Sequence, residues 1–174
     1  MDLVRIGDKV VSQTKVIEVV KEILHFRMLG MSQIEVGDRL NIERTFISRL
    51  EGIGEIRKGQ SIAAVGFPIG NKAEVQEILR EYGVDYHILM SEKERNKFVT
   101  ERSGSQLINR IMELTNKFRE FDTVIVMASD YRGKVIKGML DNQVIGIDIG
   151  KSPLKADVTI DIKELTDILK ILKG

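Results

Sequence analysis

The chain has no cysteine and no tryptophan, and its 174 residues include two prolines and two histidines. The lack of cysteine excludes disulfides, thiol catalysis and cysteine-bound metals. His25 and His87 are isolated, which argues against a histidine metal site. No apolar run is long enough to cross a bilayer, and the first residues lack a signal-peptide pattern. We therefore expect a cytoplasmic protein with no membrane partner, no metal and no cofactor.

The chain also lacks an excess of charge of either sign. Its 27 Lys and Arg residues are offset by 26 Asp and Glu residues, which leaves a net charge of +1. This balance argues against a general polyanion binder, so any binding to DNA must come from a local cluster of positive charge. The length allows one large domain or two small ones.

The stretch Ser32–Glu51 predicts two short helices joined by a tight turn. Ser32 is followed three residues later by Glu35, which is a capping-box pattern at a helix start. Asn41 interrupts the helical periodicity at a place where a turn residue with positive φ is tolerated. The apolar residues match the inward faces of two crossing helices: Ile34, Leu40, Ile42, Ile47 and Leu50. An amphipathic helix over 15–29, capped by Ser12 and closed by Gly30, completes a three-helix core.

The second of these short helices carries polar side chains between its apolar positions. With Gln33, Leu40 and Ile42, the run TFISRLE resembles the helix-turn-helix regulators of the Cro and phage-repressor type, and the resemblance covers roughly residues 15–59. In that family the second helix enters the major groove and dimers bind two-fold symmetric operators. The resemblance implies that Glu51 is a structural acceptor and that four residues face DNA: Arg44, Thr45, Ser48 and Arg49.

Three further residues join this predicted DNA-binding set. Gln33, at a helix start, suits a phosphate contact or the support of a neighbouring base-contacting residue. Arg57 and Lys58 lie in a glycine-rich turn that we expect to end the helical region, and they suit phosphate contacts. The alternative is a helical interaction domain with solvated charges. The sequence departs from the family pattern at Asn41, where a glycine is usual, and at Glu43, where a small capping residue is usual.

From residue 61 the pattern changes to alternating strands and helices. We expect strands at 61–67, 84–90, 122–128, 144–149 and 158–162, and helices at 71–83, 91–98, 104–121, 131–141 and 162–172. This alternation predicts a Rossmann-like three-layer domain with a mostly parallel sheet of about five strands. The predicted fold class is therefore α/β, with an all-α helix-turn-helix domain over 1–60 and an α/β domain over 61–174.

Loops that follow the predicted strands offer a candidate ligand site, because ligands of such folds bind beyond the carboxyl ends of the strands. The residues are Gly66, Gly70, Asn71 and Lys72 after the first strand, and Ser129 and Asp130 after the third. Amides and Lys72 would meet a small anionic effector at a helix start. The segment is not a Walker A loop, and every α/β fold needs glycines at such turns, so we favour the purely structural interpretation.

No set of catalytic residues emerges, and we do not expect an enzyme. The sequence favours a transcriptional regulator that binds double-stranded DNA as a homodimer and uses its α/β domain for dimerisation or small-molecule sensing. The alternative is an α/β enzyme or nucleotide-binding protein with an N-terminal helical interaction module. Either the long helix at 104–121 or the N-terminal helix could form the dimer interface.

Overall fold

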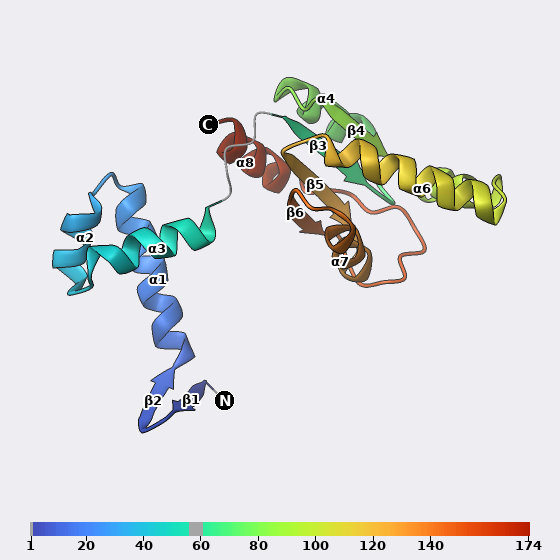
Figure 1. Cartoon of the computed structure of the whole chain (residues 1–174). Coiled ribbons are helices and arrows are strands. Elements are labelled where there is room, and N and C mark those ends of the chain that lie inside the picture. Colours follow the sequence, from blue (N-terminus) through green and yellow to red (C-terminus); the bar gives the residue numbers. More distant parts are fainter. Residues whose placement is uncertain (1, 56–60) are drawn as a thin grey trace. The chain divides into compact units, whose positions relative to one another are not determined.

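The computed structural model describes residues 2–55 and 61–174. The chain divides into two compact units, Met1–Glu55 and Ile56–Gly174 (Figure 1). Within the described residues the structure is mixed α/β, with eight helices, a four-stranded parallel sheet and a two-stranded antiparallel sheet. No helix in these ranges is long and apolar enough to span a membrane.

The first unit contains a hairpin followed by three helices. Its elements are β1 (Leu3–Ile6), β2 (Lys9–Ser12), α1 (Gln13–Met28), α2 (Gln33–Leu40) and α3 (Arg44–Gly54). The sequence analysis predicted an all-α domain over 1–60 and missed the hairpin. The signal was present, because Gly7-Asp8 separates two short runs rich in valine and isoleucine, and Gly7 takes the positive φ of 58° that such tight turns need.

Predicted caps set the helix boundaries in this unit. Ser12 accepts a hydrogen bond from the amide of Lys15 and starts α1. The capping box of Ser32 and Glu35 is confirmed at the start of α2. Asn41 ends α2 with a φ of 54°, as predicted. The three helices then share a small core centred on Ile23, Val36 and Ile47, which have no exposed surface.

The end of α3 differs from the prediction. We expected the helix to stop near Leu50 and the glycine-rich segment to turn away, but α3 continues through Gly52 to Gly54. A glycine in a helix costs only about 0.5–1 kcal/mol relative to alanine, so it weakens a helix without necessarily ending it. The predicted phosphate contacts Arg57 and Lys58 lie outside the described residues.

The second unit alternates strands and helices as predicted. Its elements are β3 (Ile62–Gly66), α4 (Lys72–Glu81), β4 (Tyr86–Leu89), α5 (Glu92–Thr100), α6 (Gly104–Arg119), β5 (Thr123–Ala128), α7 (Asp130–Met139), β6 (Gln143–Asp148) and α8 (Ile162–Lys173). The sheet order is β4-β3-β5-β6, and every neighbouring pair is parallel.

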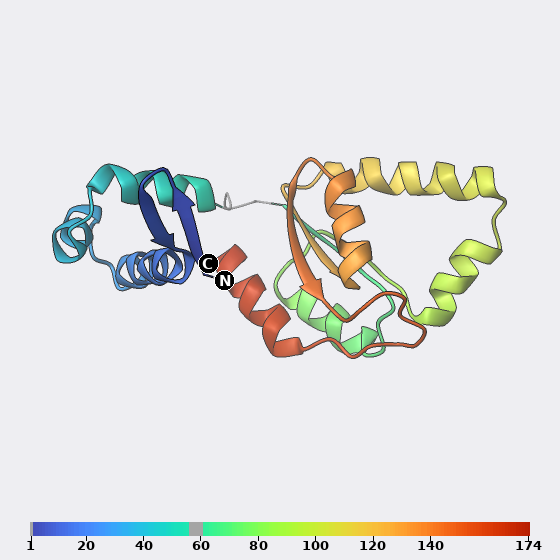
Figure 2. The same cartoon turned by 90° about the horizontal axis from the view of Figure 1, so that it is seen from below.

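Helices lie on both faces of this sheet (Figure 2). The side chains of β3 alternate between two cores: Ile62 and Ala64 pack with α4 and α8, whereas Ala63 and Val65 pack on the opposite face. On that opposite face α6 contributes Phe118, and Ile136 of α7 packs against the same cluster. All five residues of β3 are buried, as the continuous apolar run predicted.

The predicted fifth strand at 158–162 is wrong. A single parallel bridge joins Val158 to Ile69, and no ladder follows it among the described residues. The side chain of Asn71 explains this, because it accepts from the amide of Ile160 at 2.8 Å and donates to the carbonyl of Ile160 at 3.1 Å. A side-chain amide therefore takes the place of a neighbouring strand at this residue.

Close packing at Gly37 of α2 gives a test of the first unit. A Cβ atom at Gly37 would lie 2.7 Å from the carbonyl oxygen of Ile42, and backbone cannot swing away as a side chain can. We expect Gly37→Ala to destabilise this unit by about 1–3 kcal/mol. Urea unfolding of the full chain, followed through the methyl NMR signals of Ile23 and Ile47, would measure the change.

The matched control is Gly52→Ala in α3, where a Cβ atom would have nothing within 4 Å. There the substitution should stabilise the same unit by about 0.5–1 kcal/mol, because alanine favours the helix. Equal effects of the two substitutions would contradict the packing assigned to Gly37.

Candidate functional site

One face of α3 is polar and exposed. Arg44, Thr45, Ser48 and Arg49 are all exposed, whereas Ile47 on the opposite side is completely buried. At about 100° per residue, the four polar residues lie within an arc of roughly 140° on the helix surface. The structure therefore brings together the four residues that the sequence analysis selected on this helix.

Behind this face, Glu51 connects all three helices. Its Oε1 accepts from Nε of Arg27 in α1 at 2.5 Å, and its Oε2 accepts from Nε2 of Gln33 in α2 at 2.7 Å. Arg27 also donates from Nη1 to the carbonyl of Met31. The hydrogen bond from Arg27 lowers the pKa of Glu51, and the bond from Gln33 adds to this effect. Glu51 is thus the structural acceptor that the sequence analysis expected.

Gln33 forms the link between this network and the exposed face. Its amide donates to Glu51, and its Oε1 accepts a long hydrogen bond of 3.4 Å from Nε of Arg44. Gln33 is half-buried, so the network fixes it in place. Gln33 thus contacts a neighbouring residue on the next helix, and its support of a base-contacting residue stays a prediction.

Glu43 precedes α3 without capping it. It occupies the N-cap position, but its side chain makes no capping hydrogen bond and instead accepts from Oγ1 of Thr45 at 3.2 Å. A carboxylate here still interacts favourably with the helix dipole. It also holds one of the predicted DNA-facing residues and places a negative charge beside the others.

The predicted ligand loop after β3 has internal partners. A Cβ atom at Gly66 would lie 2.9 Å from Cδ1 of Ile69, so this glycine allows close packing in the core. Nζ of Lys72 lies 2.5 Å from Oε2 of Glu94, and this contact together with the hydrogen bond from the Ser91 amide lowers the pKa of Glu94 to about 2. Asn71 binds the backbone of Ile160, as described above. Gly70 lies between these residues, where its amide donates to the carbonyl of Val158.

The loop after β5 is also held by neighbours within the chain. Ser129 is completely buried, and its Oγ lies 2.7 Å from Oγ of Ser152. Asp130 accepts from the amides of Ser152 and Tyr131 at 2.9 and 2.7 Å, and these bonds lower its pKa. The six predicted ligand residues therefore stabilise the loops at the carboxyl ends of the strands, and their arrangement fits the structural interpretation.

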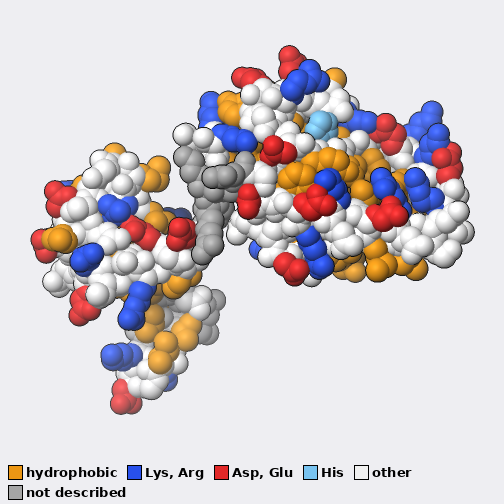
Figure 3. Space-filling model, turned by 45° about the horizontal axis from the view of Figure 1, so that its top comes forward, with side chains coloured by type: hydrophobic (Ala, Val, Ile, Leu, Met, Phe, Trp, Pro, Cys, Tyr) orange, Lys and Arg blue, Asp and Glu red, His pale blue; other side chains and the backbone are white. Residues whose placement is uncertain are grey.

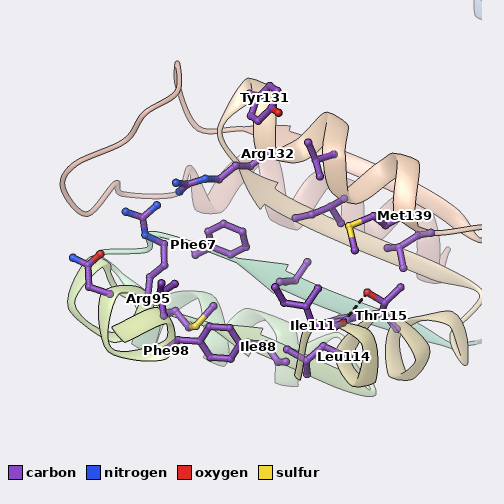
Figure 4. Close-up of a pocket in the computed structure, with 18 of the residues that line it drawn as sticks. Phe67, Ile88, Arg95, Phe98, Ile111, Leu114, Thr115, Tyr131, Arg132 and Met139 are labelled. Carbon is purple, nitrogen blue, oxygen red and sulfur yellow. Dashed lines mark hydrogen bonds between the residues drawn. The ribbon is translucent and has the colours of Figure 1, made fainter. Parts of the chain in front are cut away.

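The structure contains a cavity that the sequence analysis missed. It has a volume of about 610 Å³ and lies on the face of the sheet that α5, α6 and α7 flank (Figure 4). Its walls are mostly apolar, with Phe67, Ile88, Phe98, Ile111, Leu114 and Met139 among them, and they include Arg95 and Arg132. Arg95 lies in a charged stretch of the sequence, yet its side chain is only 16% exposed.

The Glu51 network gives a test that depends on pH. We expect Glu51→Gln to destabilise the first unit by about 1 kcal/mol at pH 7, because the neutral amide loses a charge-assisted bond. Folding lowers the pKa of Glu51. Its contribution is therefore complete above the ordinary glutamate pKa of about 4.3 and is lost as the pH falls through the lower folded value.

Urea unfolding followed at the Ile23 and Ile47 methyl groups, repeated between pH 7 and pH 3, would measure this contribution. The difference between wild type and variant should shrink as the pH falls. The control is Glu18→Gln on the exposed surface of α1. A difference that stayed constant over this range would show that ionisation of Glu51 does not stabilise the unit.

Comparison of the chain with protein-family models, curated proteins and solved structures found no match. The contacts, exposure and charges of the described residues are therefore what supports a function for this chain.

Proposed function

We propose that the protein is a sequence-specific DNA-binding transcriptional regulator that acts as a dimer. In this proposal α2 and α3 form a helix-turn-helix unit, and α3 enters the major groove of double-stranded DNA. The second unit is a Rossmann-like domain that supports dimerisation or senses a small molecule. The observation that carries the proposal is the exposed polar face of α3, which is fixed from behind by Arg27, Gln33 and Glu51.

The chemistry of this face suits base and phosphate contacts. The major groove is wide enough for one helix, and arginine can donate two hydrogen bonds to the O6 and N7 atoms of guanine. Arg44 and Arg49 supply such donors, while Thr45 and Ser48 are short enough to let the helix approach. Because Glu51 ties α3 to α1 and α2, the position of the helix is fixed before binding, and the ordering cost falls on its exposed side chains.

The small size of the exposed polar face of α3 is the reason to propose a dimer. One helix contacts only a few base pairs, and two helices separated by one turn of DNA give the specificity that a regulator needs. The first unit exposes apolar side chains that a second copy could cover: Leu3 and Val10 on one face of the hairpin, Ile6 on the other face, and Val16 and Ile17 on α1 (Figure 3). An isolated two-stranded hairpin is only marginally stable in water. We therefore place the dimer interface on β1, β2 and α1.

The DNA-binding proposal makes a direct prediction. Arg44→Ala and Arg49→Ala should each weaken specific binding by about 1–3 kcal/mol if the side chain contacts a base. Duplexes selected by the wild-type protein from a random library provide the specific site. Fluorescence anisotropy at several fixed salt concentrations would then measure the affinity of each variant. Loss of a phosphate contact changes how steeply this affinity falls with salt, and this distinguishes it from loss of a base contact.

The charge-matched control is Arg80→Ala, which removes an exposed arginine from α4 in the second unit. It should leave affinity for the selected duplex unchanged. If the Arg44 and Arg49 variants also bind as tightly as wild type, α3 is not the recognition helix.

The proposed interface makes a separate prediction. Ile6 is 64% exposed in the single chain, so Ile6→Lys should cost the monomer little stability while placing a charge in the interface. We expect this variant to sediment as a monomer and to bind the selected duplex more weakly than wild type. Ile171→Lys is the control, since Ile171 is 80% exposed on α8. A dimer that persists in the Ile6 variant would place the interface elsewhere.

A further inference from the structure

The cavity of the second unit combines apolar walls with two arginines at one end. Arg95 extends from α5 and Arg132 from α7, and the two side chains point toward one another beside Phe67 (Figure 4). The remainder of the wall is mostly apolar and includes Ile111 and Leu114 of α6. The volume of about 610 Å³ lies within the range of roughly 300–1,000 Å³ that is usual for small-molecule sites.

The hydrogen-bonding capacity of the two guanidinium groups is only partly used. Nη2 of Arg95 donates to Oε1 of Glu92 at 2.6 Å, but its Nε is buried and has no partner among the described residues. Nη1 of Arg132 is likewise buried without a partner in this part of the chain. The Arg132 guanidinium lies 5.9 Å from the centre of the Phe67 ring. Within the described ranges, two unsatisfied guanidinium donors, and one unsatisfied acceptor at Oε2 of Glu92, therefore belong to the side chains at this end of the cavity, and a small shift of either arginine would turn a donor toward a ligand.

The energetics favour an anion at this position. A buried donor without a partner costs about 1–3 kcal/mol, and more when it belongs to a charged group. Among Arg95, Arg132 and Glu92, one positive charge is in excess. A carboxylate or similar oxyanion accepts from guanidinium groups in a planar geometry, which gives strong and oriented hydrogen bonds. An apolar body attached to that anion would then cover the walls contributed by α6 and α7.

We propose that this cavity binds an amphipathic organic anion, with its charged oxygens between Arg95 and Arg132 and its apolar part against Ile111, Leu114 and Met139. This deepens the sensing role within the proposed function by naming the site and the class of ligand. Binding itself does not require the first unit to contact DNA. Its effect on operator affinity does rest on the proposed function.

Octanoate and octan-1-ol are suitable probes, because they share the apolar chain and differ in the head group. Methyl NMR of the full chain, titrated with each compound at millimolar concentrations, would report on Ile111, Leu114 and Met139 directly. We expect octanoate to shift these signals saturably at one site per chain. We expect octan-1-ol to bind at least about tenfold more weakly, which corresponds to the loss of a charged hydrogen bond.

Substitutions of the two arginines test whether they bind the carboxylate of octanoate. Arg132→Gln and Arg95→Gln should each weaken octanoate at least about tenfold and leave octan-1-ol unchanged. Arg132→Lys keeps the charge and should retain part of the affinity, even if the glutamine variants fold poorly. Arg110→Gln is the control. It makes the same change on α6, in a side chain that pairs with Glu113 and does not line this cavity.

Three results would overturn the proposal. Equal binding of octanoate and octan-1-ol would show an apolar site without anion recognition. Unchanged octanoate affinity in the Arg95 and Arg132 variants would place the anion elsewhere. Absence of octanoate shifts, together with a change of sedimentation behaviour in Ile111→Lys, would identify the cavity as a contact between copies of the chain. None of these measurements uses DNA, so failure of the DNA-binding proposal would be seen separately.

Discussion

The carboxylate of Glu51 is the contact on which the arrangement of the first unit depends. It accepts from an arginine of α1 and a glutamine of α2 while belonging to α3. The apolar core beneath it consists of only a few fully buried side chains, and packing of that kind leaves helix orientation loosely defined. Directional hydrogen bonds to one carboxylate add the orientation that the small core lacks. These hydrogen bonds therefore help to set the orientation of α3 and of its exposed polar face.

The second unit shows a different balance between its two faces. On one face α4 and α8 close over the sheet, and three leucines of α8 are buried there: Leu165, Leu169 and Leu172. On the other face, the buried cluster that includes Phe118 and the strand side chains leaves a cavity between the flanking helices. Apolar residues of α6 and α7 remain partly exposed around it, including Ile111 and Met139. One face of the sheet is therefore covered by a closely packed core, whereas the other face has a cavity large enough for a small molecule.

Local signals in the sequence were sufficient for most elements. The capping box at Ser32 and the positive φ at Asn41 depend on neighbouring residues, and they were predicted correctly. The long-range features were less accessible. Asn71 lies 89 positions before Ile160 in the sequence, and its side chain forms the hydrogen bonds with the Ile160 backbone that a neighbouring strand would otherwise form. The cavity was invisible for the same reason, because it is built from separate segments whose alignment only the fold determines. On α3 the exposed face followed from periodicity, but the link from Gln33 to Arg44 did not.

The bond between Asn71 and Ile160 also affects the order in which the chain can acquire its structure during synthesis. The first unit spans only Met1–Glu55, so the residues of its own core are complete once that segment has left the ribosome. The second unit cannot complete its core until α8 has been synthesised, because α8 supplies buried leucines. The hydrogen bond between Asn71 and the Ile160 amide likewise cannot form until Ile160 has been synthesised. Each nascent chain therefore passes through a stage in which the core residues of the first unit are all present while one face of the second unit's sheet still lacks α8.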